Sequence, residues 1–390
     1  MNGRYASIGF LAAVGSRGAI AACAILCTVG LAFSQSHREG TIVTFDAPGA
    51  GTGLYQGTIA YSIGPGGTIA GDYQDSSGVW HGLLRTPDGT IIERNQASCS
   101  QGYPGTSINP AGAMIGFCAD ANSVYHGILR APDGAITRFD APGAGASAGQ
   151  GTFTAWPNGI NPAGAITGDF LDANNVYHGF LRSPDGAITR FDAPGAGTGP
   201  FQGTLVSLFQ PASSGGINDE GEITGTYVDG NNIVHGFLRP RDGVITTFDA
   251  PGAGTVTGSL PGTYPAGINA AGVIAGAYFD NGILGHGLLR ARDGAFTAFQ
   301  VPGAGLGPFQ GTVALAINPE GTVTGNYVDA NGAFHGYLRT PDGAITKFDV
   351  PGASTVAGEG TLPYSINAAG VIAGYYFDKN NVVHGFLRFP

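Results

Sequence analysis

Short β-rich runs bounded by turn residues follow one another along most of the chain, and the stretch 159–197 shows the pattern clearly. It holds three such runs, GAITGDFLD (164–172), VYHGFLR (176–182) and AITRFDA (187–193), whose composition is typical of strands. An Asp-Gly pair separates the last two runs and is a strong hairpin signal, because glycine tolerates a positive φ. Together with a run that ends in Gly-Ile-Asn before the first turn, the pattern predicts four antiparallel strands, A to D, joined by three tight turns.

Copies of this pattern recur along the chain, each marked by a histidine that precedes a glycine in strand C. The histidines are His81, His126, His178, His235, His286, His335 and His384. A period of about 50 residues indicates a repeat architecture, and a four-stranded meander with that period is typical of a β-propeller blade. The alternative, an open solenoid, would need capping repeats at both ends.

The two ends of the repeat region favour a closed ring. The last copy has strands A to C and lacks strand D, whereas a lone D strand, Thr41–Ala47, stands before the first strand A. Pairing this strand with Val382–Phe389 would complete the last blade and leave no end to cap. We therefore predict an all-β fold: a seven-bladed β-propeller of four-stranded antiparallel blades, closed by an N-terminal strand that completes the last blade.

The N-terminal segment differs in kind from the repeats. Arg4 and Arg17 precede the uncharged run Ala19–Ser34, which ends in small residues at the two positions that an export peptidase reads. This pattern predicts a signal peptide over 1–34 and a single propeller domain over 35–390, secreted to the periplasm or the medium. The alternative is a retained membrane anchor, but the run is shorter than the ~20 residues that a span needs. We expect no membrane span in the mature chain.

Composition and charge narrow the class of protein and of partner. The chain has 69 Gly, 24 Pro and 11% charged residues, which suits short strands and tight turns. Its 43% share of hydrophobic residues argues against a disordered chain. A net charge of −10 without a cluster of Lys or Arg argues against nucleic acid and anionic membranes as partners. We expect a monomer.

Two of the four cysteines, Cys99 and Cys118, lie outside the predicted signal peptide. Cys118 occupies a strand B position where the other copies have Tyr or Phe, and Cys99 follows the one D strand, 91–95, that lacks the Phe-Asp-x-Pro-Gly pattern. Both departures fall at one blade, which predicts a Cys99–Cys118 disulfide in an oxidising compartment. The alternative is two unpaired buried thiols. Cys23 loosely fits a lipoprotein box, which we rank below simple cleavage.

The core Gly-Ile-Asn-x-x-Gly-x-Ile-x-Gly at 159–168, followed by His-Gly-Phe-Leu-Arg at 178–182, resembles the bacterial HAF extracellular repeat family. The resemblance extends over residues 39–390. The chain departs from that family in having Gly where Ala follows the His, and Arg where Trp follows the Leu. The resemblance implies an exported repeat protein, and it supplies no reaction, substrate or catalytic residue.

Polar residues that recur in every copy are expected to serve the scaffold. The strand C histidines suit a contact with a neighbouring turn, and the strand C arginines are expected to pair with the strand D aspartates of the same blade. These aspartates are Asp46, Asp140, Asp192, Asp249 and Asp349. The aspartates of the B–C turn, such as Asp172, are expected to cap that turn, because the loop is too short for an EF-hand. We predict no metal site and no cofactor.

Positions that differ between copies are better candidates for function. One follows the strand B glycine and holds Asp72 and Asp169, which are candidate catalytic carboxylates. Another is the D–A connection, which varies in length and carries candidate ligand-binding residues. These are Tyr55, Gln56, Trp156, Phe201, Gln202, Phe309 and Gln310. The alternative role of these aromatic side chains is packing between blades.

Two function classes remain. The first is an exported, non-catalytic propeller that binds a glycan, a peptide or a cell-surface protein. The alternative is a hydrolase or lyase that acts on an extracellular polysaccharide or similar polymer, with Asp72 and Asp169 as its carboxylates. The near-symmetry of the copies favours binding. Because the A–B and C–D turns are nearly uniform, we predict that a ligand binds on the opposite face, among the D–A connections.

Overall fold

The computed structural model describes four stretches of the chain, residues 40–94, 101–206, 215–256 and 261–390. Every regular element in these stretches is a β-strand, which confirms the all-β prediction. No helix within them is long and apolar enough to cross a membrane. The predicted signal peptide, 1–34, and Cys99 lie outside the described residues, so export and the Cys99–Cys118 disulfide stay predictions.

Consecutive strands form antiparallel meanders, as the tight turns of the sequence predict. The first two meanders are β2 (Gly57–Ile63), β3 (Ile69–Gln74), β4 (Trp80–Arg85) and β5 (Ile91–Glu93), then β6 (Gln101–Ile108), β7 (Met114–Ala119), β8 (Tyr125–Arg130) and β9 (Ile136–Phe139). The next two are β10 (Gly151–Thr154), β11 (Ile166–Leu171), β12 (Tyr177–Arg182) and β13 (Ile188–Phe191), then β14 (Gly203–Leu205), β15 (Gly216–Ile217), β16 (Ile223–Val228), β17 (Val234–Arg239) and β18 (Thr246–Phe248).

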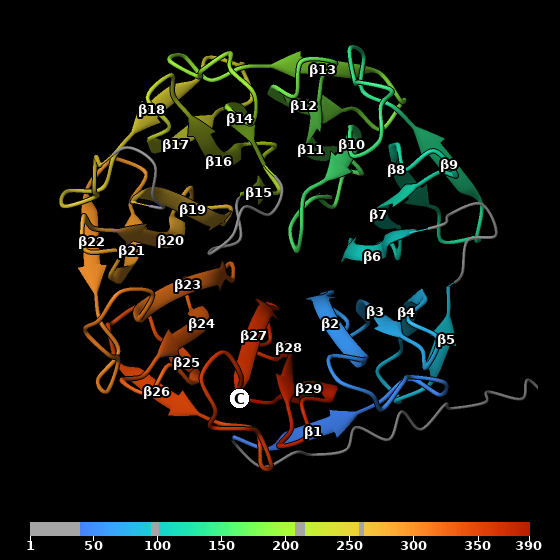
Figure 1. Ribbon diagram of the computed structural model, residues 1–390, viewed down its shortest axis with the longest axis vertical. Coiled ribbons are helices and arrows are strands. Elements are labelled where there is room, and N and C mark those ends of the chain that lie inside the picture. Colours follow the sequence, from blue (N-terminus) through green and yellow to red (C-terminus); the bar gives the residue numbers. More distant parts are fainter. Residues whose placement is uncertain (1–39, 95–100, 207–214, 257–260) are drawn as a thin grey trace, which may run out of the picture. The chain divides into compact units, whose positions relative to one another are not determined.

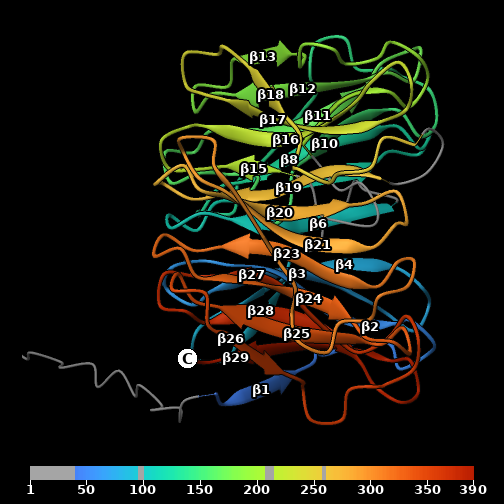
Figure 2. The ribbon, with the colours of Figure 1, turned by 90° about the vertical axis from the view of Figure 1, so that its left-hand side faces the viewer.

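Two further meanders and an incomplete one follow. They are β19 (Gly262–Ile268), β20 (Ile274–Phe279), β21 (Gly285–Arg290) and β22 (Phe296–Phe299), then β23 (Gly311–Ile317), β24 (Val323–Val328), β25 (Phe334–Arg339) and β26 (Ile345–Phe348), and finally β27 (Thr361–Ile366), β28 (Ile372–Phe377) and β29 (Val383–Arg388). The three strands of the last meander gain a fourth from the other end of the described chain. This strand is β1 (Ile42–Phe45), which pairs antiparallel with β29 from Ile42 opposite Arg388 to Phe45 opposite Gly385. Figure 2 shows β1 and β29 side by side at the bottom of the view.

The described residues form one compact body with a propeller-like arrangement. Its meanders surround a central axis, with the first strand of each nearest the axis and the last strand at the periphery (Figure 1). A parallel bridge joins many neighbouring meanders, as where Gly151 of β10 lies opposite Tyr125 of β8. The same kind of bridge joins Gly57 of β2 to Val383 of β29.

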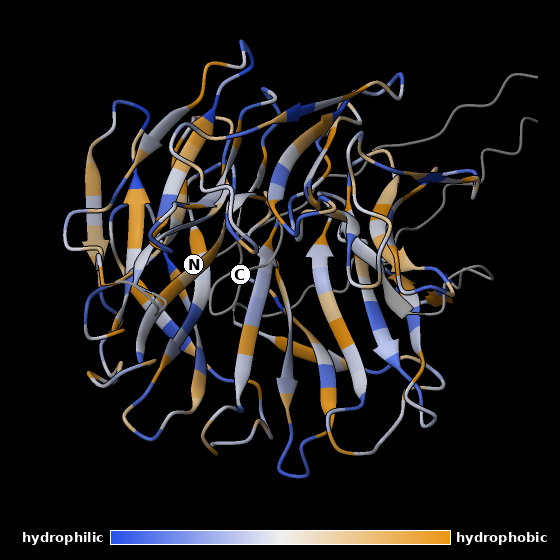
Figure 3. Ribbon diagram, turned by 45° about the horizontal axis from the view of Figure 1, so that its top comes forward, coloured by the Kyte–Doolittle hydropathy of each residue, from blue (hydrophilic) through white to orange (hydrophobic). Residues whose placement is uncertain are grey.

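The apolar residues of the strands pack between neighbouring meanders. Orange bands of hydrophobic residues cross the strands, whereas many connecting turns are blue or white (Figure 3). Among the largest fully buried side chains are Phe170, Phe180, Phe237, Tyr264 and Tyr337, which all lie on strands. Burial of one such side chain contributes about 1.5–3 kcal/mol, so the folding free energy is spread over many similar interfaces.

The phenylalanine of strand D explains both the His-Gly glycine and the strand C arginine. The ring of Phe191 in β13 covers Gly179 of β12 so closely that a Cβ on Gly179 would overlap it. On the other side, Arg239 of the next meander lies over the same ring, with 5.1 Å between Cζ and the ring centroid. The same stacking joins Arg85 to Phe45, Arg182 to Phe139, Arg290 to Phe248, Arg339 to Phe299 and Arg388 to Phe348.

The strand D aspartates contact histidines, so the expected pairing with the strand C arginines is wrong. Asp192 Oδ1 lies 2.6 Å from His178 Nδ1, and the ring of Phe170 packs against the same imidazole at 5.1 Å between centroids. Equivalent contacts join Asp46 to His384, Asp140 to His126, Asp249 to His235 and Asp349 to His335. The arginine is instead long enough to reach the neighbouring meander, where its guanidinium stacks on an aromatic ring.

The B–C turn aspartates cap their own turns, as expected. Asp172 Oδ1 accepts hydrogen bonds from the N–H groups of Asn174 (2.8 Å) and Val176 (2.9 Å). Asp75, Asp120, Asp229, Asp280, Asp329 and Asp378 accept the equivalent pairs. No group of three or more His, Cys, Asp or Glu side chains suited to a metal ion is found in the described stretches.

Candidate functional site

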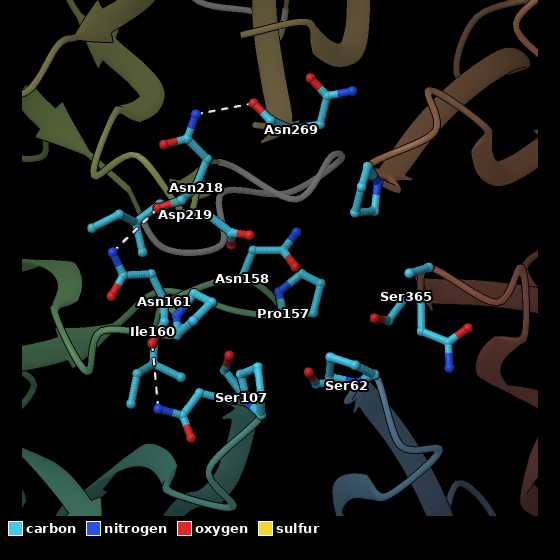
Figure 4. Close-up of a pocket in the computed structure, with 18 of the residues that line it drawn as sticks. Ser62, Ser107, Pro157, Asn158, Ile160, Asn161, Asn218, Asp219, Asn269 and Ser365 are labelled. Carbon is cyan, nitrogen blue, oxygen red and sulfur yellow. Dashed lines mark hydrogen bonds between the residues drawn. The ribbon is translucent and has the colours of Figure 1, made fainter. Parts of the chain in front are cut away.

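A cavity of about 190 Å³ opens where the first strands of the meanders turn into their second strands. It lies at the central axis, because residues from the ends of many first strands line it together (Figure 4). Its polar lining includes Ser62, Ser107, Ser365 and Asn158. Among the described residues that line it, only Asp219, which is exposed, carries a charge. The cavity is therefore on the face of the A–B turns, opposite the face on which the sequence predicts a ligand.

An asparagine at the end of the first strand links most meanders to the next one around this cavity. Asn161 Nδ2 donates a hydrogen bond to the carbonyl oxygen of Asn218 (3.2 Å), and Asn161 Oδ1 accepts one from the N–H of Ala165 (2.9 Å). The same two roles are played by Asn109, Asn218, Asn269, Asn318 and Asn367. One amide thus fixes its own turn and the neighbouring meander, so the rim of the cavity is held by a series of side-chain bonds.

The D–A connections carry three of the predicted binding residues in one shared conformation. Tyr55, Phe201 and Phe309 have φ values of 61°, 62° and 61°, in the left-handed region that bulky residues rarely adopt. Their side chains are 56%, 59% and 56% exposed. Each backbone N–H donates a hydrogen bond to the carbonyl oxygen of a B–C turn residue, Asn381, Asn175 and Ile283 respectively. The three rings are therefore presented by the same loop geometry at three places.

The glutamine after each of these rings is engaged within the loop. Gln202 Oε1 accepts a hydrogen bond from the N–H of Gly199 (2.9 Å), and its Nε2 donates one to Asn232 Oδ1 (2.9 Å). Gln310 bonds Gly307 and the carbonyl oxygen of Ala330 in the same way. Gln56 accepts a bond from the N–H of Gly53 at 3.1 Å. These amides shape the D–A connection and so position the rings.

Trp156 does not join this set of exposed rings. It is 8% exposed, and its ring packs edge-on against Tyr61 with 4.6 Å between centroids. Tyr61 in turn lies 6.0 Å from the ring of Tyr364, measured between centroids. These three residues come from β2, from β27 and from the segment after β10. Trp156 therefore packs with aromatic side chains of distant meanders, and the structure does not bring it together with Tyr55, Phe201 or Phe309.

The two candidate catalytic carboxylates are buried at equivalent positions between neighbouring meanders. Asp72 Oδ1 accepts a hydrogen bond from the N–H of Gly105 (3.1 Å), and Asp169 Oδ1 accepts one from the N–H of Val206 (3.1 Å). Both residues are 0% exposed, and neither lines the cavity. Burial raises the pKa of the Asp72 carboxyl well above its usual range, although the bond from Gly105 opposes this. Each carboxylate therefore lies in the buried interface between two neighbouring meanders.

We expect the stability of the protein to fall with rising pH through Asp72, and Asp72→Asn to remove this effect. Between the pKa of the unfolded carboxyl, about 4, and the raised pKa of the folded one, only the folded Asp72 keeps its proton, so the free energy of unfolding falls by up to about 1.4 kcal/mol per pH unit. The advantage of Asp72→Asn over the wild type in urea unfolding should then grow as the pH rises above about 4. The exposed turn variant Asp133→Asn is the control, and a constant difference would contradict the assignment.

Cys118 is 2% exposed in β7, and its expected partner Cys99 lies outside the described residues.

The segment Gly145–Gly149 matches the Gly-x-Ser-x-Gly pattern of hydrolase nucleophiles, with Ser147 at its centre. It forms a D–A connection between two strands, whereas that motif requires a turn from a strand into a helix. We therefore assign Ser147 no catalytic role.

Comparisons with known proteins give no family for this chain. No family model matches it, and no curated protein matches its sequence. Among solved structures, it is similar to a puromycin hydrolase at 14% identity and a TM-score of 0.49, covering 85% of this chain and 51% of that one. It is similar to the BP39L lectin from Burkholderia pseudomallei at 11% identity and a TM-score of 0.48, covering 85% and 96%. It is also similar to a streptogramin B lyase at 13% identity and a TM-score of 0.36, covering 90% and 98%. Since these TM-scores lie below 0.5, we draw no function from them.

Proposed function

We propose that this chain forms a closed seven-bladed β-propeller that is exported and that binds a neutral glycan without catalysis. Three contacts near the two ends of the described chain support the closure. Besides the pairing of β1 with β29, Asn367 Nδ2 donates a hydrogen bond to the carbonyl oxygen of Gly64 (3.3 Å). In addition, Arg85 lies over the ring of Phe45, with 4.9 Å between Cζ and the ring centroid.

The observation that carries the binding role is the conformation of the exposed rings. Two other D–A connections have a glycine at the equivalent position, Gly149 and Gly358, with φ values of 84° and 82°. Their N–H groups make the same kind of bond, to the carbonyl oxygens of Ser123 and Gly332. A side chain in this region costs roughly 1–2 kcal/mol relative to glycine. The ring of Tyr55 has a partner in Phe377, at 6.1 Å between centroids, whereas Phe201 and Phe309 are more than half exposed. A ligand contact is therefore the better reason for a ring at Phe201 and at Phe309.

The chemistry around the rings favours a neutral glycan. An exposed aromatic ring offers a flat apolar face on which the C–H face of a sugar ring can stack, and binding sites combine such faces with a few polar groups. The net charge of −10 disfavours anionic polymers over neutral ones. Peptides and cell-surface proteins are the other ligands that the same rings could serve, and the binding experiment separates them.

Replacing Phe201 or Phe309 by glycine should weaken glycan binding without lowering stability. Each ring should contribute about 1–3 kcal/mol of binding free energy, which is a loss of roughly tenfold or more in affinity. Because glycine adopts the left-handed conformation without strain, thermal stability should stay the same or rise. A panel of immobilised neutral glycans, followed by titration with the one bound most tightly, measures the first effect, and thermal unfolding measures the second.

The matched control is Pro184→Ala in a C–D turn, on the opposite face, which should leave binding unchanged. Pro162 is unsuitable as a control because it lines the cavity at the A–B turns. If the rings only pack between blades, both glycine variants will lose stability and keep their affinity. If no glycan binds while a peptide or a surface protein does, the ligand class is wrong and the ring site stands.

The alternative of a hydrolase or lyase has less support in the geometry. Asp72 and Asp169 each use one oxygen to accept a backbone hydrogen bond from the next meander, both are fully buried, and neither lines the cavity. Polysaccharide turnover by the wild type that is lost in Asp169→Asn, with the fold intact, would favour this alternative.

A further inference from the structure

In each meander an isoleucine lies just before the A–B turn, and the residue before this isoleucine differs between meanders. The difference gives the wall of the cavity two sides, which we call the serine side and the glycine side. Three meanders that follow one another around the axis, those of β27, β2 and β6, have serine there: Ser365, Ser62 and Ser107. The remaining four positions hold residues with little or no side chain, Gly159, Gly216, Gly267 and Ala316. Since the strand forms with glycine at this position in other meanders, the fold of a meander does not explain the serines.

On the glycine side, a segment of the chain lies in the opening of the cavity. The segment after β10 crosses this side, and the carbonyl oxygen of Asn158 accepts a hydrogen bond from the N–H of Ile217 (2.9 Å). A Cβ on Gly216 would lie 2.7 Å from Asn158 Cβ, and one on Gly267 would lie 3.3 Å from Asn158 Nδ2. Gly216 and Gly267 are therefore explained by the close approach of Asn158. The same segment reaches the serine side through Trp156, whose ring packs against Tyr61 next to Ser62.

On the serine side, hydroxyl groups face the cavity. Ser62, Ser107 and Ser365 are 4%, 1% and 4% exposed, and Figure 4 shows them around the same space as Pro157 and Asn158. Ser365 Oγ accepts a hydrogen bond from the N–H of Ile63 (3.3 Å), which joins β27 to β2. The hydroxyls of Ser62 and Ser107 have no hydrogen-bond partner among the described residues. Neither hydroxyl is sealed from solvent, so both are available to a molecule that enters the cavity.

We propose that this cavity is a second binding site, for a small neutral polyol of monosaccharide size or less. Serine hydroxyls donate and accept, as do the hydroxyls of such a ligand, while Ile63, Ile108 and Pro157 supply apolar walls. The volume of about 190 Å³ is below the roughly 300–1,000 Å³ that pockets for drug-sized ligands have. The carboxylate of Asp219 at the rim disfavours anionic sugars and phosphates. The asparagine bonds hold the rim rigid before binding.

This site is independent of the proposed glycan site. The cavity lies where the first strands end, whereas Phe201 and Phe309 come immediately before the first strands of their meanders, at the opposite face. The two proposals can therefore fail separately.

The experiment is ligand-observed NMR titration of the exported chain with myo-inositol and with the methyl glycosides of glucose, galactose, mannose and N-acetylglucosamine. We expect at least one of these probes to bind, and the Ser62→Ala and Ser107→Ala variants to weaken that binding about tenfold each. Each variant removes a hydroxyl without a partner, so the midpoint of thermal unfolding should not fall. Phe201→Gly and Ser183→Ala, which lies in a C–D turn, should bind the probe like the wild type.

Three outcomes would overturn the proposal: none of the five probes binds, the probe binds both serine variants with unchanged affinity, or Phe201→Gly abolishes probe binding. Should a serine variant unfold, Asn158→Ala provides the second measurement, since it removes an amide from the other side of the cavity. Unchanged affinity in that variant and in the remaining serine variant would equally exclude the cavity as the site.

Discussion

Deletion of residues 40–50 should lower the free energy of unfolding by about 5 kcal/mol, out of proportion to its length. It removes β1 and leaves β29 with an unpaired edge. It also removes the ring of Phe45, which packs over Gly385 and beneath Arg85, and the contact of Asp46 with His384. Loss of a packed phenylalanine alone typically costs about 3–5 kcal/mol in a full core. Since a domain is stable by only about 5–15 kcal/mol, the cooperative transition should move or vanish.

Urea unfolding followed by tryptophan fluorescence and by circular dichroism measures this effect. The substitution Phe45→Ala keeps the strand and removes only the ring, so it should produce a smaller loss, of about 2 kcal/mol, because this ring is half-buried. An unchanged transition after the deletion would show that the N-terminal strand contributes nothing to the body, and the ring closure that we propose would then be wrong.

The strands themselves could be predicted from the sequence because each is bounded by residues with a local reason to turn. The run 176–182 corresponds to β12 and the run 164–172 to β11, which ends one residue earlier because Asp172 already begins its turn. The run 187–193 is longer than β13, which ends at Phe191. Ala193 leaves the ladder because its N–H donates a hydrogen bond to Thr204 Oγ1 (2.8 Å) in the next meander. Local chemistry thus predicts the element, and contacts with a neighbour decide its end.

The features that the sequence did not predict correctly are contacts between meanders. A repeat shows which residues recur but not which neighbour they face, so the sequence predicts an aspartate partner for Arg239 within its own blade, whereas Arg239 covers Phe191 of the preceding meander. For the same reason, Gly-Ile-Asn predicts the entry to a turn but not the bond that its asparagine makes to the next meander. The signal for the cavity is the presence of serine in some copies and of glycine or alanine in others before Ile108 and its equivalents, but only the structure shows that these positions meet.

Asn318→Ala should destabilise the protein by about 3 kcal/mol, and Gly64→Asn should stabilise it by about 1 kcal/mol. Asn318 is 3% exposed. Its side-chain amide donates a hydrogen bond to the carbonyl oxygen of Asn367 and accepts one from the N–H of Thr322, and the substitution removes both bonds. An unsatisfied buried group costs about 1–3 kcal/mol, and here a buried carbonyl oxygen and a half-buried N–H lose their partner. The control is Asn331→Ala, whose amide bonds an exposed turn.

Gly64 occupies the position that the other six meanders fill with the bridging asparagine. The turn that follows Gly64 has the same backbone hydrogen bonds as the turns that follow these asparagines. The N–H of Gly64 donates to the carbonyl oxygen of Thr68 (2.8 Å) and its own carbonyl oxygen accepts from Gly67 (2.9 Å), as in the turn of Asn161. A Cβ on Gly64 would meet Thr68 and Ile108 at ordinary distances of 3.6 and 3.8 Å. Asparagine at this position can therefore donate to the carbonyl oxygen of Asn109 and accept from the N–H of Thr68. It also lowers the entropy of the unfolded chain. A raised midpoint in thermal unfolding is expected, and a lowered one would mean that the series of asparagine bonds cannot be continued across the β2 and β6 meanders.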